Sequence, residues 1–327
     1  MEYLVSVIIP NYNGGKTIGN CIEAAFSSRY PMFEVVVVDD CSTDDSVDVI
    51  KRFPCKLICL DRHAGTSKAR NTGVSHSAGQ ILFFTDADCV LGEDTLSEAV
   101  TSLSELKTTV VGGTYTTIPV DDGFFSTFQS VFVNYSETKR REPDYIATHA
   151  MVISRELLVR SGGFPEDFLP ILEDVELSHR LRRSGCRLIM NPAITVRHIF
   201  NFTLMKSLGN GFRKSLFWTK YSLGNRDILA DSGTASKELK LNVILYPTEA
   251  VAIIFFLISG KGYFLLLTVC LFILNLLSSR RLIMAFYRAK GFFFALEAAL
   301  YYTMIYPLAV GSGAIIGAFS HMFSRRK

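Results

Sequence analysis

The chain has 327 residues, 49% of them hydrophobic and 20% charged, and a formal net charge of +3. This length is long for one domain and predicts about two. The small net charge speaks against a nucleic-acid partner, and seven cysteines without a Cys-x-x-Cys pair favour a reduced compartment over a disulfide framework.

Short apolar runs alternate with stretches of helical periodicity over the first 90 residues. An apolar, β-branched run at residues 4–9 predicts the first strand, which Pro10 and a pair of glycines end, and we expect no signal peptide before it. The next predicted elements are a helix at 17–28, a strand at 33–38, a helix ending near 52, a strand at 56–60, a helix at 67–77 and a strand at 81–84. This alternation predicts an α/β fold with a doubly wound, mostly parallel sheet.

Carboxylates follow two of these strands directly. Asp39 and Asp40 come after the second strand, and Asp86 and Asp88, separated by Ala87, come after the fourth. Ligands bind at the carboxyl edge of an open α/β sheet. Paired carboxylates there suit a hard cation, Mg²⁺ or Mn²⁺, whose shell a phosphate-bearing substrate completes. A solvated turn after a strand is the alternative, because Asp is common in turns.

Weaker patterns continue this soluble unit to about residue 200. They predict a helix at 95–105, a strand at 109–117, helices at 123–138 and 173–183, and a strand near 194–198. Phenylalanines recur at helical spacing in the helix at 123–138. We expect that stripe to pack in a core, with contact to a bilayer as the alternative.

The last third of the chain is far more apolar. Residues 203–223 join basic to bulky apolar side chains, which suits the surface of an anionic membrane; a helix packed on the soluble unit is the alternative. Residues 241–260 and 262–279 are each long and apolar enough to cross a bilayer, and the glycines between them predict a tight hairpin. A third segment, 291–323, contains proline and glycine and either crosses or re-enters.

These patterns predict a domain at 1–200, an amphipathic interfacial linker at 201–240 and a membrane region at 241–327 with two or three hydrophobic segments. Basic clusters flank the apolar segments, and such clusters prefer the cytoplasmic side. If the chain crosses twice and the third segment re-enters, all the basic clusters lie on the cytoplasmic side. If the chain crosses three times, the last cluster, at 325–327, lies on the opposite side. We expect a multi-pass protein of the cell membrane with its first domain in the cytoplasm.

Five motifs stand in the order seen in the family 2 glycosyltransferases. They are Ser6-Val-Ile-Ile-Pro-Asn-Tyr-Asn13, Val36-Val-Val-Asp-Asp-Cys-Ser-Thr-Asp44, Lys68-Ala-Arg-Asn-Thr-Gly73, Asp86-Ala-Asp88 and Glu173-Asp174. Over residues 4–200 the chain therefore resembles that family, whose members have the GT-A fold and usually invert configuration at the sugar. The resemblance implies a nucleotide-sugar donor, typically linked to UDP.

The resemblance implies a nucleotide site at the ends of the first two strands. Pro10 and Asn11 match the position where the family brings backbone against the nucleotide. Asp40, beside Asp39, matches the acid that accepts a hydrogen bond from the base. Arg70 matches a basic residue near the base and diphosphate, where a bidentate donor suits an anionic group. Helix capping by the two Asp and a solvated Arg are the alternatives.

The resemblance also implies a metal site at the Asp-x-Asp motif. Asp86 and Ala87 match the ribose side of the donor site, and Asp86 and Asp88 match its metal ligands. His198 matches a further metal ligand of some relatives, while a structural role is the alternative. His149 has a weaker case as a ligand.

An acceptor site is implied at the Glu-Asp pair. Asp174 matches the general base that takes the proton from an acceptor hydroxyl, and Glu173 matches a residue that orients the acceptor. Carboxylates favoured by the dipole at a helix N-terminus are the alternative.

The sequence lacks a Gln-x-x-Arg-Trp motif after Glu173-Asp174, which disfavours processive polymer synthesis. The leading interpretation is a membrane-anchored, metal-dependent enzyme of the cell envelope that transfers one sugar to a lipid or lipid-linked glycan. One alternative is a polyprenyl-phosphate sugar synthase, whose lipid phosphate is itself the nucleophile. Another, of a different class, is a catalytically silent, membrane-bound nucleotide-binding protein.

Overall fold

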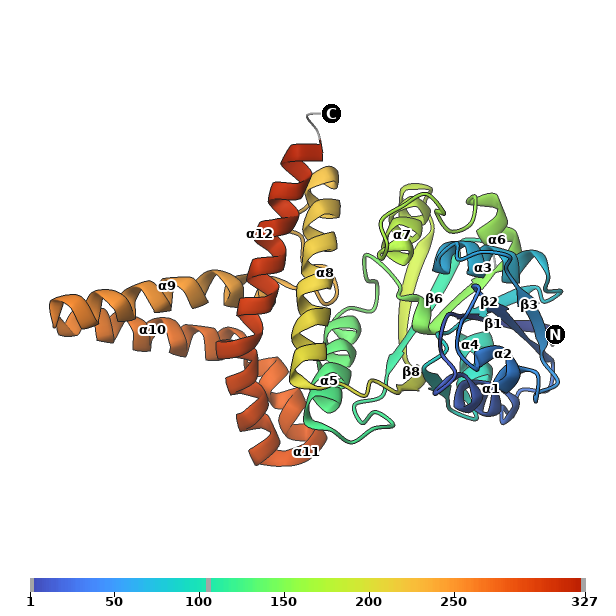
Figure 1. The fold of residues 1–327 in the computed structure, drawn as a ribbon, viewed down its shortest axis with the longest axis horizontal. Coiled ribbons are helices and arrows are strands. Elements are labelled where there is room, and N and C mark those ends of the chain that lie inside the picture. The colour runs from blue at the N-terminus through green and yellow to red at the C-terminus, as the bar shows by residue number, and fades with distance from the viewer. Residues whose placement is uncertain (1–2, 104–106, 325–327) are drawn as a thin grey trace. The chain divides into compact units, whose positions relative to one another are not determined.

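The protein is described by a computed structural model that covers residues 3–103 and 107–324 (Figure 1). The chain divides into two units. Unit 1 comprises the described residues of Met1–Asp122 and Glu137–Asn201, and unit 2 those of Gly123–Ser136 and Phe202–Lys327. This division differs from the contiguous ranges predicted above, because a short segment from the middle of the chain belongs with the C-terminal unit.

Unit 1 is built on a mixed sheet, in which the described residues form eight strands in the order β3-β2-β1-β4-β7-β6-β8-β5. The strands are β1 (Val5–Asn11), β2 (Phe33–Asp39), β3 (Lys56–Cys59), β4 (Ile81–Phe84), β5 (Cys89–Leu91), β6 (Thr109–Tyr115), β7 (Met151–Ser154) and β8 (Arg187–His198). The first four pair in parallel, and so do β6 and β8. β7 is antiparallel to β4 and β6, and β5 is antiparallel to β8. The α/β class and the parallel half of the sheet are as predicted.

Helices connect these strands. They are α1 (Ile18–Phe26), α2 (Ser46–Ile50), α3 (Thr66–Ser75), α4 (Thr95–Ser102), α6 (Arg155–Arg160) and α7 (Glu173–Arg183), with a 3-10 turn at Thr148–Ala150. The sequence did not predict β5, β7 or α6, which are three to six residues long and too short to show a periodic pattern. The predicted end of the helix at 95–105 lies outside the described residues.

The core of unit 1 lies between the sheet and its helices. Ile8, Leu82 and Phe84 are buried with the apolar residues of β7 and α7. Phe84 meets Phe164 edge to face, with 5.0 Å between ring centroids. Gly73 allows α3 to cross β1 closely, since a Cβ there would lie 2.6 Å from Ile8 Cγ2. This packing fixes α3, and with it Arg70, beneath the carboxyl edge of the sheet.

Unit 2 is helical. Its helices are α5 (Phe124–Thr138), α8 (Leu204–Asn225), α9 (Lys237–Ser259), α10 (Gly262–Ser278), α11 (Arg280–Leu300) and α12 (Tyr306–Ser324), with a π-helical turn at Tyr301–Ile305. The predicted hairpin is present, because α9 and α10 pack against each other across Gly260 (Figure 1). The aromatic stripe of α5 packs inside the unit: Phe128 stacks on Phe286 at 5.2 Å and meets Tyr301 edge to face at 4.8 Å.

Helix α8 lies along α12 within unit 2 (Figure 1). Gly313 and Gly317 face the backbone of α8, where a Cβ would collide with the carbonyl oxygens of Phe212 and Leu216. Small residues four apart permit such close helix packing. The basic and aromatic segment predicted as an interfacial linker is therefore one half of a tightly packed helix pair.

Two helical runs among the described residues are long and apolar enough to cross a membrane, Lys237–Ser259 and Arg280–Phe323. Helix α10, at 17 residues, is shorter. The backbone leaves helical geometry at Lys290 and Gly291, which divides the second run into two parts. In the most apolar stretch of α9, 17% of the residues are buried. Helix α9 thus presents apolar side chains on much of its surface. The same holds for α10, where Leu266, Leu274 and Leu277 are about half exposed or more.

Candidate active site

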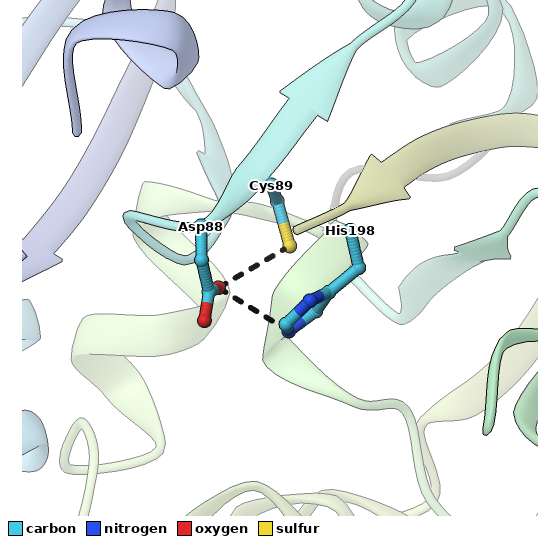
Figure 2. Close-up of side chains that lie close together, drawn as sticks. All are labelled: Asp88, Cys89 and His198. Atoms are coloured by element: carbon cyan, nitrogen blue, oxygen red, sulfur yellow. Dashed lines mark hydrogen bonds and ion pairs between the residues drawn. The ribbon is translucent and has the colours of Figure 1, made fainter. Parts of the chain in front are cut away.

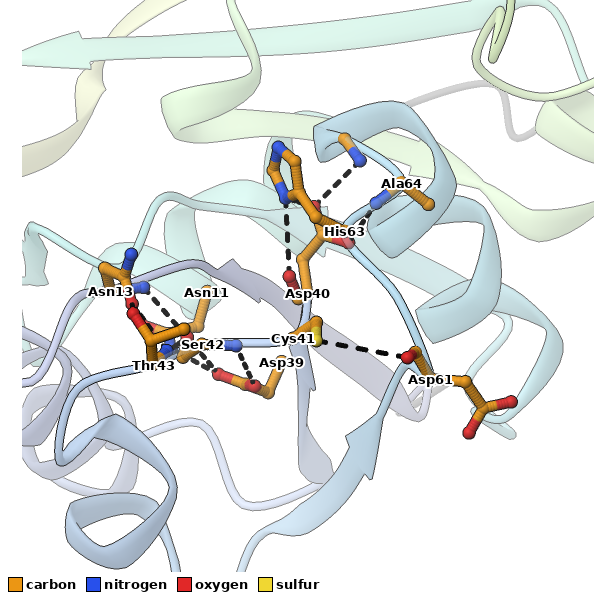
Figure 3. A network of polar contacts seen from close by, with 11 residues as sticks. Asn11, Asn13, Asp39, Asp40, Cys41, Ser42, Thr43, Asp61, His63 and Ala64 are labelled. Carbon is orange, nitrogen blue, oxygen red and sulfur yellow. Dashed lines mark hydrogen bonds and ion pairs between the residues drawn. The ribbon is translucent and has the colours of Figure 1, made fainter.

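The ends of β1 and β2 carry a network of polar contacts (Figure 3). Asn11 and Asp39 lie opposite each other in the sheet, next to the pair of Pro10 and Val38. Asn11 Nδ2 donates to Asp39 Oδ1 over 2.8 Å, and the backbone and hydroxyl of Ser42 donate to the same carboxylate. Asp39 is buried, so these bonds replace its hydration and tie the two strand ends together.

Asp40 holds the loop before α3 (Figure 3). Its two carboxylate oxygens accept hydrogen bonds from the backbone N–H groups of Ala64, at 2.7 Å, and Gly65, at 2.8 Å. His63 Nδ1 lies 2.9 Å from Asp40 Oδ2, and the ring of His63 packs on exposed Tyr12 with centroids 4.1 Å apart. The structure therefore brings the predicted nucleotide-side residues of β1 and β2 together, with the ring of Tyr12 beside them.

Arg70 joins two carboxylates that are far apart in the sequence. Its Nη2 lies 2.8 Å from Asp86 Oδ1, and its Nη1 lies 2.5 Å from Glu173 Oε1. The guanidinium is buried 5.5 Å from the centre of the Phe164 ring. Burial disfavours its charge, but Glu173 and Asp86 outweigh that effect and raise the pKa of Arg70. Arg70 is thus a fixed cation that links the Asp-x-Asp motif to α7.

Asp88 and His198 lie side by side at the start of β5, directly after the Asp-x-Asp motif (Figure 2). His198 Nε2 is 3.3 Å from Asp88 Oδ1. Cys89, one residue along, points its sulfur at the same carboxylate oxygen over 3.9 Å. Burial, followed by the charge of Asp86, raises the pKa of Asp88 to about 7.

A divalent cation fits this arrangement, because a carboxylate oxygen and an imidazole nitrogen converge at a partly open position. The described residues that converge as potential ligands are Asp88, Cys89 and His198, with all three ligand atoms within 4.8 Å of one another. Asp86, also predicted as a ligand, accepts a hydrogen bond from Arg70 through Oδ1, and its role as a ligand stays a prediction. Cys89 was not predicted, since its position depends on the short strand β5.

Asp174 lies in the first turn of α7, next to Glu173. Its carboxylate accepts hydrogen bonds from the backbone N–H of Val175, at 2.8 Å, and of Thr148, at 3.4 Å. Burial, and after it the charge of Glu173, raises the pKa of Asp174 to about 7. A carboxylate that exchanges its proton near neutral pH suits general base chemistry.

A second buried ion pair lies beside the site and was not predicted. His149 Nε2 is 3.3 Å from Glu137 Oε2, and Thr114 donates to the same carboxylate over 2.7 Å. His149 stacks on Tyr115 with centroids 4.0 Å apart, and Tyr115 meets His198 edge to face at 5.0 Å. Burial disfavours the imidazolium, but Glu137 outweighs it and raises the pKa of His149. His149 thus supports the ring that packs against His198.

The chain is similar in sequence to known glycosyltransferases. Residues 6–161 match the family model described as Glycosyl transferase family 2. Glycosyltransferase AglE of Haloferax volcanii is 30% identical over 176 residues, which are 50% of this chain and 57% of that protein. Glycosyltransferase GlyG of Streptococcus pneumoniae is 29% identical over 130 residues, 38% of this chain and 43% of that one. The chain spans about half the length of the curated relatives it matches.

The fold is shared with a solved enzyme. The structure of the mannosyltransferase PcManGT from Pyrobaculum calidifontis, in complex with GDP-Man and Mn²⁺, matches with a TM-score of 0.61 and 21% identity over 99% of this chain and 88% of that one. With the mixed eight-stranded sheet, this likeness confirms the predicted GT-A class of fold.

Proposed function

Because residues 6–161 form a family 2 glycosyltransferase domain on a GT-A fold, we propose that the protein transfers one sugar from a nucleotide-sugar to an acceptor in a metal-dependent reaction. The observation that carries the proposal is that two sets of side chains, a candidate cation site and a candidate proton-transfer site, lie at the same edge of the sheet. Asp88 and His198 supply cation ligands, and Arg70 joins Asp86 to the helix that holds Asp174.

In the proposed reaction, the cation site acts on the leaving group and Asp174 acts on the acceptor. Asp88 and His198 would hold the cation, which offsets the negative charge that develops on the diphosphate leaving group. Asp174, in its carboxylate form, accepts the proton of the acceptor hydroxyl. The oxygen then bonds to the anomeric carbon as the bond to the diphosphate breaks, on the opposite face, which inverts the configuration. Arg70, which bridges Asp86 and Glu173, holds the donor site and the acceptor site in a fixed position relative to each other.

The donor is proposed to be a UDP-sugar with Mg²⁺ or Mn²⁺. Asp39 and Asp40 lie at the edge where the base would bind, and Tyr12 offers an exposed ring there. PcManGT, which shares the fold, was solved with GDP-Man and Mn²⁺, so a GDP-sugar is the second candidate.

A thermal-shift panel tests this proposal. A ligand that binds the native state raises its stability by about 2.7 kcal/mol at 100 times its dissociation constant. We expect a UDP-sugar with Mn²⁺ to raise the melting temperature and the same compound in EDTA to raise it less. Mn²⁺ alone and free sugar are the controls. If no nucleotide-sugar in a panel of UDP, GDP, CMP and dTDP compounds shifts the transition, the protein is not a nucleotide-sugar enzyme.

Unit 2 is proposed to anchor the protein in a membrane, and the acceptor is proposed to be a lipid or a lipid-linked glycan. Val251, Ile254 and Leu257 of α9 are about half exposed or more. Apolar surface of this extent marks a membrane or protein contact. A polyprenyl phosphate is the second candidate acceptor.

Membrane fractionation tests the anchor. Wild-type protein should stay with membranes through an alkaline carbonate wash. Val251→Asp combined with Ile254→Asp should be extracted in large part, because Asp costs about 2.5–3.5 kcal/mol at the centre of a spanning helix. Val159→Asp, at an apolar position of unit 1 that is at least as exposed, is the matched control, and this variant should remain in the pellet. Wild-type protein that is folded and monodisperse without detergent would contradict the anchor.

A further inference from the structure

We propose that Cys89 is a third cation ligand, so that Asp88, Cys89 and His198 together bind a thiophilic divalent cation of the Zn²⁺ class. This inference rests on the metal role of Asp88 proposed above. It adds the binding of a thiophilic cation to a site that is proposed to bind a hard cation. Occupancy by Zn²⁺ would then exclude the hard cation that supports transfer, since both need Asp88 and His198.

The position of Cys89 follows from strand pairing. β5 is antiparallel to β8, and Cys89 lies directly opposite His198 in the register. Opposed residues of an antiparallel pair project from the same face of the sheet, so the sulfur and the imidazole share one side. Asp88 stands one residue before, at the start of the strand. Figure 2 shows the three side chains pointing toward one another.

The distances suit a small cation. Asp88 Oδ1 lies 3.3 Å from His198 Nε2 and 3.9 Å from Cys89 Sγ, and all three ligand atoms are within 4.8 Å of one another. Zinc bonds of about 2.0–2.3 Å imply separations of roughly 3.3–3.8 Å between tetrahedral ligands. A modest side-chain adjustment therefore completes the site.

The donor set decides the class of cation. Mg²⁺ takes oxygen ligands, whereas a set of one carboxylate oxygen, one imidazole nitrogen and one thiolate is typical of zinc. Binding breaks the S–H bond of Cys89, forms a metal–sulfur bond and releases one proton to solvent. Three protein ligands leave a fourth position for water or a substrate oxygen. The side chain of Asp88 is 40% exposed, which gives the cation a path to the buried sulfur.

Co²⁺ is the probe that tests this site, because a cobalt–thiolate bond absorbs in the near ultraviolet and a cobalt–oxygen bond does not. Metal-free, full-length protein in detergent is titrated with Co²⁺ and, separately, with Zn²⁺ and Mn²⁺. We expect one equivalent of Co²⁺ to produce the thiolate band in the wild type. Cys89→Ser and Cys89→Ala should both lose the band. Cys59→Ser, at an exposed cysteine of β3, is the control and should keep it.

The affinities complete the test. Zn²⁺ affinity should fall in both Cys89 variants by at least the roughly 10–100-fold that loss of an outer-shell partner costs, while Mn²⁺ affinity changes much less. Cys89→Ala keeps a small apolar group at this position. If its melting temperature without metal equals that of the wild type, the fall in Zn²⁺ affinity comes from loss of a ligand and not from loss of packing. A thiolate band that survives in both variants, or that never forms in wild type which still binds Mn²⁺, overturns the role of Cys89 alone. Failure to bind any of the three cations overturns the metal role of Asp88 as well.

Discussion

Asp88→Ala is expected to reduce sugar transfer by at least about 10²–10³-fold, the loss that follows removal of one group stabilising a developing negative charge. Without this carboxylate, the cation loses its oxygen ligand and keeps only the imidazole of His198 and the thiol of Cys89. UDP affinity should fall in Mn²⁺ and change little in EDTA, because the loss acts through the cation. Single-turnover transfer and calorimetric titration of Mn²⁺ and UDP measure the two effects.

Asp48→Ala is the matched control for this experiment. Asp48 is an exposed carboxylate on α2, with 78% of its side chain accessible, and its removal should leave both quantities unchanged. Wild-type turnover that is insensitive to EDTA would show that no cation takes part.

Asp174→Asn is expected to reduce turnover by about 10²–10⁴-fold when the acceptor is a sugar hydroxyl. Asn keeps the size and shape of the side chain but cannot accept the proton. The pKa of Asp174 is raised to about 7. Because the carboxylate form is the active one, wild-type single-turnover rates should rise with pH through about 7 and then level off. The mutant should lose this rise, while donor binding stays nearly unchanged.

The same substitution separates the two acceptor classes. A lipid phosphate is already anionic at neutral pH and needs no base, so Asp174→Asn should then cost less than about tenfold. Glu176→Gln, on the same helix and paired with Arg180, is the control for local disturbance of α7. Full activity of Asp174→Asn on a hydroxyl acceptor would remove Asp174 from the reaction.

Local sequence patterns were sufficient to predict the strand ends that carry the site. Asp39 and Asp86 follow apolar runs, and the helix at Glu173–Arg183 was predicted with its observed bounds. These features depend on neighbours a few residues away, where propensity and periodicity act.

The contacts between distant segments could not be predicted in the same way. Arg70 pairs with Glu173 across 103 positions, and no local pattern encodes that approach. The register that sets Cys89 opposite His198 depends on a three-residue strand. His149 was considered only as a weaker candidate ligand, and its ion pair with Glu137 could not be predicted, since Glu137 lies on another element. Side-chain partners of this kind are determined by tertiary packing.

The division of the chain has a consequence for how the protein is made. Unit 2 takes Gly123–Ser136 from the middle of the sequence, so no single backbone cut yields both units whole. Phe128 leaves the ribosome about 160 residues before Phe286, its stacking partner. Synthesis proceeds at about 5–20 residues per second, so the aromatic face of α5 stays without its native packing partner in α11 for roughly 10–30 s.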